Sequence, residues 1–152
     1  MSEYTIRATK PSDIPSIMAI ELEAETAAHW PKAEYERIFV PGGVSRITLV
    51  AECRDKISGF IVARRIDKEW ELENVAVRPV SRRQGLGRAL VEHLLKLARE
   101  ASAARIFLEV RESNQAARRL YSQLGFLETG RRPRYYSHPV EDAITYEIVI
   151  GI

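Results

Sequence analysis

Several features are scarce in this sequence, and each absence narrows what the protein can be. The 152 residues include one cysteine, Cys53, so an internal disulfide is impossible and a reducing compartment is expected. No apolar run approaches the roughly 20 residues of a membrane span. The first residues lack a basic segment followed by an apolar one, so we expect no secretory signal. These absences predict a cytoplasmic protein without a membrane partner.

A large excess of one charge is also missing. The 23 Lys and Arg residues and 21 Asp and Glu residues give a net charge of +2, too small a surplus to indicate a nucleic-acid-binding protein. A local cluster of cations could still bind one anionic ligand. The histidines, His29, His93 and His138, have no partner at metal-ligand spacing, and Cys53 stands alone. We therefore predict no metal site.

Hydrophobic periodicity predicts a single domain over residues 1–152, with the order β-α-α-β-β-β-α-β-α-β-β. This pattern is typical of an α/β fold in which helices cover the faces of a mixed sheet. The helices are expected to begin near Ser12 or Asp13, at Pro31, at Leu86 and at Asn114. The expected strands cover about residues 4–9, 47–53, 58–65, 70–77, 106–110, 127–134 and 143–150.

A glycine pair lies between an expected strand and a long helix, in the run Arg82-Arg83-Gln84-Gly85-Leu86-Gly87-Arg88. Glycine lets the backbone turn tightly and approach a ligand, and the first turn of a helix presents free N–H groups. With the arginines, this run could bind a pyrophosphate. It matches neither the P-loop nor the dinucleotide motif, since no Gly-Lys-Ser/Thr and no third glycine follow. The alternative is an ordinary strand-to-helix turn with solvated arginines.

A glutamate interrupts the apolar strand expected over residues 106–110. A carboxylate in a buried strand is costly unless it has a partner or a water-lined cleft. Glu109 therefore has either a chemical task or a salt bridge to an arginine such as Arg105 or Arg111. Tyr121 follows on the next expected helix, where the alternative to a chemical role is plain core packing.

The run Arg83–Arg88 resembles the R/Q-x-x-G-x-G/A signature of the GCN5-related N-acetyltransferases (GNAT), where this loop holds the pyrophosphate of acetyl-CoA. The resemblance covers the chain in element order, most closely over about Leu72–Ile144. It implies a GNAT-like fold with a mostly antiparallel sheet, and acetyl-CoA as the donor substrate. The residues that it implies for acetyl-CoA binding are Val75, Ala76, Val77, Arg83, Gln84, Gly85, Leu86, Gly87, Arg88, Asn114 and Tyr121.

The run Leu108–Asn114, followed by Tyr121, is similar to one branch of that family, the ribosomal-protein alanine N-acetyltransferases. The resemblance implies direct attack by the N-terminal α-amine of a small-subunit ribosomal protein, with Glu109 as the base and Tyr121 as the acid. A backbone N–H near Val77 would hold the oxyanion. The residues that it implies for acceptor binding are Tyr135, Tyr136 and Trp30.

Two alternatives stay open at this point. The segment Glu23–Arg46, which faces the acceptor in the family, has Trp30 and Pro31 as its recognisable landmarks. The chain could therefore be a GNAT enzyme that acetylates a small amine, an antibiotic or a lysine side chain. A different class is a non-catalytic acyl-CoA-sensing or RNA-contacting module that uses Arg82, Arg83 and the cluster Arg131–Arg134.

Overall fold

A seven-stranded sheet forms the centre of the protein in a computed structural model, which describes residues 4–24, 29–82 and 85–151. Its strand order is β1-β2-β3-β4-β5-β7-β6, and all neighbours are antiparallel except β4 and β5. The strands are β1 (Thr5–Ala8), β2 (Arg46–Cys53), β3 (Lys56–Ile66), β4 (Glu69–Val77), β5 (Arg105–Arg111), β6 (Leu127–Ser137) and β7 (Val140–Val149). The helices are α1 (Ile14–Glu23), α2 (Lys32–Arg37), α3 (Leu86–Glu100) and α4 (Gln115–Gln123), with short 3-10 helices η1 (Pro11–Asp13) and η2 (Pro79–Ser81).

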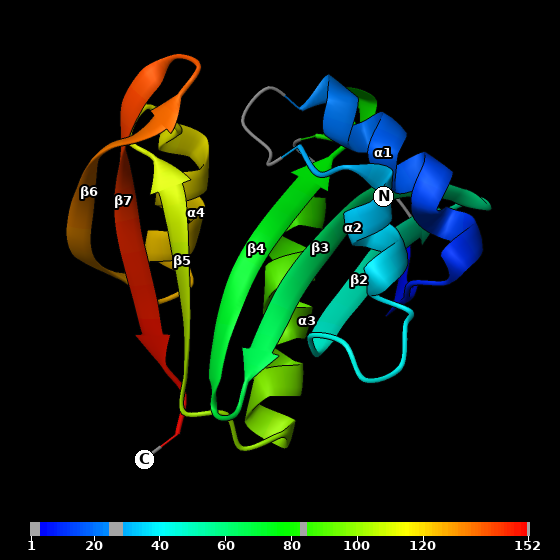
Figure 1. The fold of residues 1–152 in the computed structure, drawn as a ribbon, viewed down its shortest axis with the longest axis horizontal. Helices are drawn as coiled ribbons and strands as arrows, with labels where there is room; N and C mark the ends of the chain where they lie inside the picture. The colour runs from blue at the N-terminus through cyan, green and yellow to red at the C-terminus, as the bar shows by residue number, and fades with distance from the viewer. Residues whose placement is uncertain (1–3, 25–28, 83–84, 152) are drawn as a thin grey trace.

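Helices cover both faces of the sheet, as the sequence predicts: α1 and α2 lie on one face, and α3 and α4 on the other (Figure 1). The alternation in β2 and β3 explains why both faces need cover. Leu49 and Ile61 belong to the core under α3, whereas Val50 and Phe60 belong to the core under α1 and α2. The predicted stripe of α3 is buried, comprising Leu90, Val91, Leu94, Leu95 and Ala98. No helix of the described residues is long and apolar enough to cross a membrane.

Some element boundaries differ from the sequence expectation. The turn between β2 and β3 consists of Arg54 and Asp55, both at positive φ, and Lys56 already belongs to β3. Strands β6 and β7 extend to Ser137 and from Val140, past the expected limits near 134 and 143. This end of the hairpin is held by backbone hydrogen bonds, and its exposed side chains do not alternate between apolar and polar. Hydrophobic periodicity therefore could not predict how far the two strands extend.

The parallel pair β4–β5 is short and opens into a fork. Its register runs from Glu69 opposite Arg105 to Leu72 opposite Leu108. Between β3 and β4 the register shifts at the same level, which leaves Glu73 as an extra residue in β4. Beyond this bulge β4 and β5 diverge, as Figure 1 shows.

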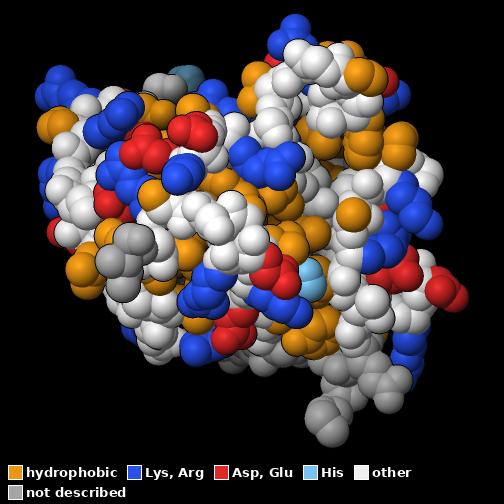
Figure 2. All heavy atoms as spheres, turned by 90° about the horizontal axis from the view of Figure 1, so that it is seen from below, with side chains coloured by type: hydrophobic (Ala, Val, Ile, Leu, Met, Phe, Trp, Pro, Cys, Tyr) orange, Lys and Arg blue, Asp and Glu red, His pale blue; other side chains and the backbone are white. Residues whose placement is uncertain are grey.

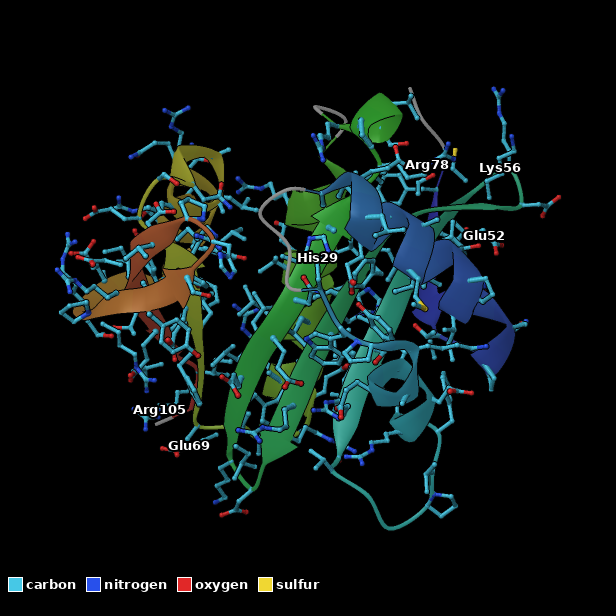
Figure 3. The ribbon with its side chains drawn as sticks, turned by 45° about the horizontal axis from the view of Figure 1, so that its top comes forward. His29, Glu52, Lys56, Glu69, Arg78 and Arg105 are labelled. Atoms are coloured by element: carbon cyan, nitrogen blue, oxygen red, sulfur yellow. The ribbon has the colours of Figure 1, made fainter. Side chains whose placement is uncertain are left out.

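Ion pairs of one arginine hold the strands together at the closed end of the fork, where β4 and β5 still pair. The guanidinium Nε of Arg105 donates to Glu69 Oε1 at 2.7 Å, where β4 and β5 still pair (Figure 3). Arg105 Nη1 also donates to Glu147 of β7 at 2.9 Å. The arginine therefore joins the three strands at the end away from the opening.

Candidate active site

A cavity of about 390 Å³ lies where β4 and β5 diverge. We call it the cleft. Strand β4 and the segment before α2 form one wall, and β5, α4 and β6 form the other. The residues that line it are His29, Leu72, Glu73, Asn74, Val75, Glu109, Val110, Arg111, Asn114, Ala117, Tyr121 and Tyr136.

Glu109 reaches the cleft because β5 alternates. Leu108 and Val110 pack in the core under α3, so Glu109 projects from the opposite face of the strand. Its side chain is 15% exposed, and its Oε2 is buried without a hydrogen bond. Among the residues that the structure describes, the cation paired with it is Arg132, whose Nε lies 3.6 Å from Oε2. The expected alternative of a salt bridge to an arginine is therefore present, but its partner is Arg132. Arg105 and Arg111, given as examples, pair instead with glutamates of β4 and β7.

Tyr121 enters the cleft from α4 and is 4% exposed. Its ring packs against Phe126 and Tyr146, with centroids 5.5 and 6.2 Å away. The ring of Tyr121 therefore packs in the core, as the alternative expected, and the residue also lines the cleft. Burial raises the pKa of the Tyr121 phenol above its usual value of 10.0, so the phenol carries its proton at neutral pH.

The donor side of the cleft combines a strand edge with a helix start. The N–H of Arg78 donates to Ser58 O of β3 at 2.8 Å. Because N–H groups alternate along a strand, those of Val77 and Val75 point the other way, toward the gap that β5 leaves. Val75 lines the cleft, and Ala76 between them is buried under α1 and α2.

The glycine loop begins α3 as predicted. Gly85 has φ +75°, in the left-handed region that favours glycine, and it immediately precedes Leu86. Leu86, Gly87 and Arg88 form the first turn, whose N–H groups have no acceptor within the helix. The predicted ligands Arg83 and Gln84 lie outside the described residues.

Asn114 caps α4, because its Oδ1 accepts the Ala117 N–H at 3.2 Å, and it also lines the cleft. The predicted Asn114 cap is therefore confirmed. Arg82 Nε donates to Val77 O at 3.3 Å, next to the strand edge described above.

The three residues expected to bind the acceptor are placed differently from one another. Tyr136 lines the cleft, with the guanidinium carbon of Arg111 4.2 Å from its ring centroid. Tyr135 is 51% exposed and stacks with Arg132 instead. The Trp30 ring packs 5.2 Å from Tyr35, and the residue of that segment lining the cleft is its neighbour His29, which lies over β4 in Figure 3.

Sequence reasoning did not single out several cleft residues. Glu73 enters the wall through the β4 bulge, which leaves no recognisable pattern in the sequence. His29 and Arg132 come from segments far from Glu109 in the chain, and the fold brings them together. The signals for them were the segment Glu23–Arg46 and the arginine run Arg131–Arg134.

A larger cavity, of about 820 Å³, lies at the other end of α3. It is lined by the end of β1, the start of β2 and the last turns of α3, with Phe39 and Trp70 among its apolar residues. Figure 2 shows a hollow in this face of the molecule, and hydrophobic side chains form the bottom of the hollow. It shares no residue with the cleft, so neither Glu109 nor Tyr121 lines it.

Comparison with known proteins places this architecture and its cleft in a class of acyl-transfer enzymes. The acetyltransferase (GNAT) family matches residues 14–126. The [ribosomal protein bS18]-alanine N-acetyltransferase of Escherichia coli K12 is 36% identical over 151 residues, covering 97% of this chain and 99% of the relative. The Salmonella typhimurium protein of the same name is 34% identical, covering 97% and 99%.

Solved structures agree. The ribosomal-protein-S18-alanine N-acetyltransferase from Escherichia coli superimposes with a TM-score of 0.89 and 34% identity, covering 99% of this chain and 96% of that one. Ard1 from Thermoplasma volcanium gives 0.86 and 30%, covering 98% and 99%. The chain therefore belongs to the GNAT acetyltransferase family. The family and fold class predicted from the sequence are confirmed.

Proposed function

We propose that this protein uses acetyl-CoA to acetylate the N-terminal alanine of a ribosomal protein of the bS18 type. The observation that carries the proposal is the fork of β4 and β5, which places Glu109 and Tyr121 on one cleft. Relatives that match nearly the whole chain are named for this acceptor. The buried Oε2 of Glu109 accepts no hydrogen bond and has the exposed Arg132 at 3.6 Å. This favours an enzyme over a binding module, because substrate could supply the missing hydrogen bond.

The donor would enter along the strand edge and the start of α3. N–H groups of Val75 and Val77 would pair with the amide-bearing arm of the donor, as a further strand would. The first turn of α3, after Gly85, offers N–H groups and a positive dipole to the pyrophosphate. Asn114 and Ala117 border the same space from α4.

Glu109 would take the proton from the attacking α-amine, directly or through one water. The amine nitrogen then forms a bond to the thioester carbon, and the carbon–sulfur bond breaks. The Val77 N–H would face the oxyanion that develops between these events. Tyr121 would give its proton to the departing thiolate, a task that suits a phenol kept protonated by burial.

Acceptor choice would follow from the charges at the cleft. An N-terminal α-amine has a pKa of about 7.7–8.0, against about 10.4 for lysine, so a carboxylate base suffices near neutral pH. Tyr136 and His29 line the cleft, where the first side chain of the acceptor would lie. A peptide N-terminus therefore fits this chemistry better than an internal lysine.

Mass spectrometry of a peptide panel tests the proposal. The protein is incubated with acetyl-CoA and peptides that begin with Ala, Ser, Met or Gly, each containing an internal lysine. We expect the mass of one acetyl group at the N-terminus of the Ala peptide first. Acetylation of lysine with untouched N-termini would contradict the proposed acceptor, and no acetylation of any amine would contradict the proposed reaction.

A further inference from the structure

The acceptor end of the cleft concentrates carboxylates, each beside an arginine. Glu73 and Glu109 line the cleft. Arg46, whose side chain is 10% exposed, donates to Glu73 at 2.8 Å. At Glu109 the pairing is looser: Arg132 is 58% exposed, and the separation of 3.6 Å exceeds a hydrogen bond. Of these two cations, Arg132 is the one that can leave at little cost.

Arg132 lies beside an irregularity in the edge strand. Arg132 lies on β6, at the edge of the sheet, opposite Ala143. The next pair along the ladder is Tyr136 with Glu141, so β6 advances by four residues where β7 advances by two. Strand β6 therefore bulges directly after Arg132. The guanidinium carbon lies 5.4 Å from the Tyr135 ring centroid, and this exposed ring can hold the cation when it leaves the carboxylate.

The ammonium of the acceptor and the guanidinium of Arg132 would both occupy the position beside the Glu109 carboxylate. A protein N-terminus arrives largely as an ammonium at neutral pH, and it must reach Glu109 to lose its proton. The Oε2 of Glu109 is buried, and Arg132 Nε already stands 3.6 Å from it, so an ammonium that approaches Oε2 meets Arg132 there. After acetylation the N-terminus is an amide without charge, which no longer competes for the carboxylate.

We infer that Arg132 is a displaceable counter-ion of Glu109. The cationic acceptor replaces Arg132 when it binds, and Arg132 returns when the product has become neutral. Arg132 is thus a specificity-determining residue that separates substrate from product by charge. The inference rests on the proposed function, because it takes Glu109 as the group that receives the α-amine.

Calorimetry with two peptides tests it. One peptide begins with a free Ala, and the other is the same peptide with an acetylated N-terminus; both are titrated into protein with CoA, which transfers no acetyl group. In Arg132→Gln the free-amine peptide should bind up to about fivefold more tightly, the value of an exposed ion pair. Affinity for the acetylated peptide should stay unchanged.

Two variants serve as controls. Arg132→Lys keeps the cation and should keep the wild-type ratio of the two affinities. Arg99→Gln removes the same charge from the last turn of α3, far from the cleft, and should change neither affinity. If Arg132→Gln weakens both peptides equally, Arg132 binds the acceptor chain rather than competing with it. If it changes neither, Arg132 does not occupy the acceptor position. Either result overturns the inference.

The same titrations keep this test separate from the proposed function. If the wild type neither binds nor acetylates the Ala peptide, the proposed acceptor is overturned. If the wild type binds and acetylates the Ala peptide while Arg132→Gln leaves its affinity unchanged, the inference about Arg132 alone is overturned.

Discussion

Replacing Glu109 by glutamine separates a chemical role from a structural one. The amide keeps the size of the side chain and removes its ability to accept a proton. If Glu109 is the base, turnover should fall by roughly 10²–10⁴. The loss should be greatest below the pKa of the amine, about 7.7–8.0. Raising the pH should restore part of the rate, because the amine then arrives neutral.

The geometry predicts that this replacement costs little stability. Breaking a buried ion pair typically costs about 3–5 kcal/mol, because one charge stays buried and unpaired. Here the partner, Arg132, is 58% exposed and returns to water. Exposed pairs contribute about 0.2–1 kcal/mol. Burial is the main cause that raises the pKa of Glu71; repulsion from Glu109 adds to it, and this repulsion disappears in the variant. The free energy of unfolding should therefore change by less than about 1 kcal/mol.

Two measurements decide between the roles. Free thiol released from acetyl-CoA is followed from pH 6 to 9 with saturating Ala peptide, and urea unfolding is followed at pH 7. A variant that is stable and fully active at every pH would refute the assignment of Glu109 as the base. A variant destabilised by several kcal/mol, with unchanged rate per folded molecule, would show that the ion pair is structural.

Further predictions concern the acid, the donor loop and the pH dependence of stability. Tyr121→Phe keeps the buried ring packed, so thiol release should fall at least tenfold with little change in melting temperature; an unchanged rate would remove Tyr121 from the mechanism. Gly85→Ala places a side chain at φ +75° and should cost about 1–2 kcal/mol in urea unfolding. Gly87→Ala, whose Cβ would lie in ordinary contact with Val77 Cγ2 at 3.8 Å, should not destabilise. CoA at 100 times its Kd should stabilise the protein by about 2.7 kcal/mol in thermal melts, and no shift would contradict the donor site. Hydrogen bonds from Arg7 lower the pKa of Asp13, so its contribution is present above about pH 4 and is lost as pH falls through the lowered pKa. Asp13→Asn should therefore cost about 1–3 kcal/mol at pH 7 and less near pH 2, as measured by urea unfolding.

The sequence by itself determined the class of fold and the local chemistry. Apolar periodicity predicted the strand and helix order, because burial of one face imposes a repeat on the residues that form it. The glycine pair predicted a tight turn before α3, where Gly85 has positive φ, and Asn114 predicted the cap of α4, because both are local demands of the backbone. The family motif then predicted roles for Glu109 and Tyr121, and the structure places both on one cleft.

Only the tertiary structure decided how these residues meet. The fork of β4 and β5 depends on a bulge at Glu73 and on a pairing that stops at Leu72, both properties of strand partners rather than of one segment. The partner of Glu109 was expected among Arg105 and Arg111, yet the arginine beside it is Arg132 from the edge strand. Ion pairs between strands follow from register, and register is set by contacts between residues distant in the chain. For that reason the sequence could name the carboxylate but not the cation that lies beside it.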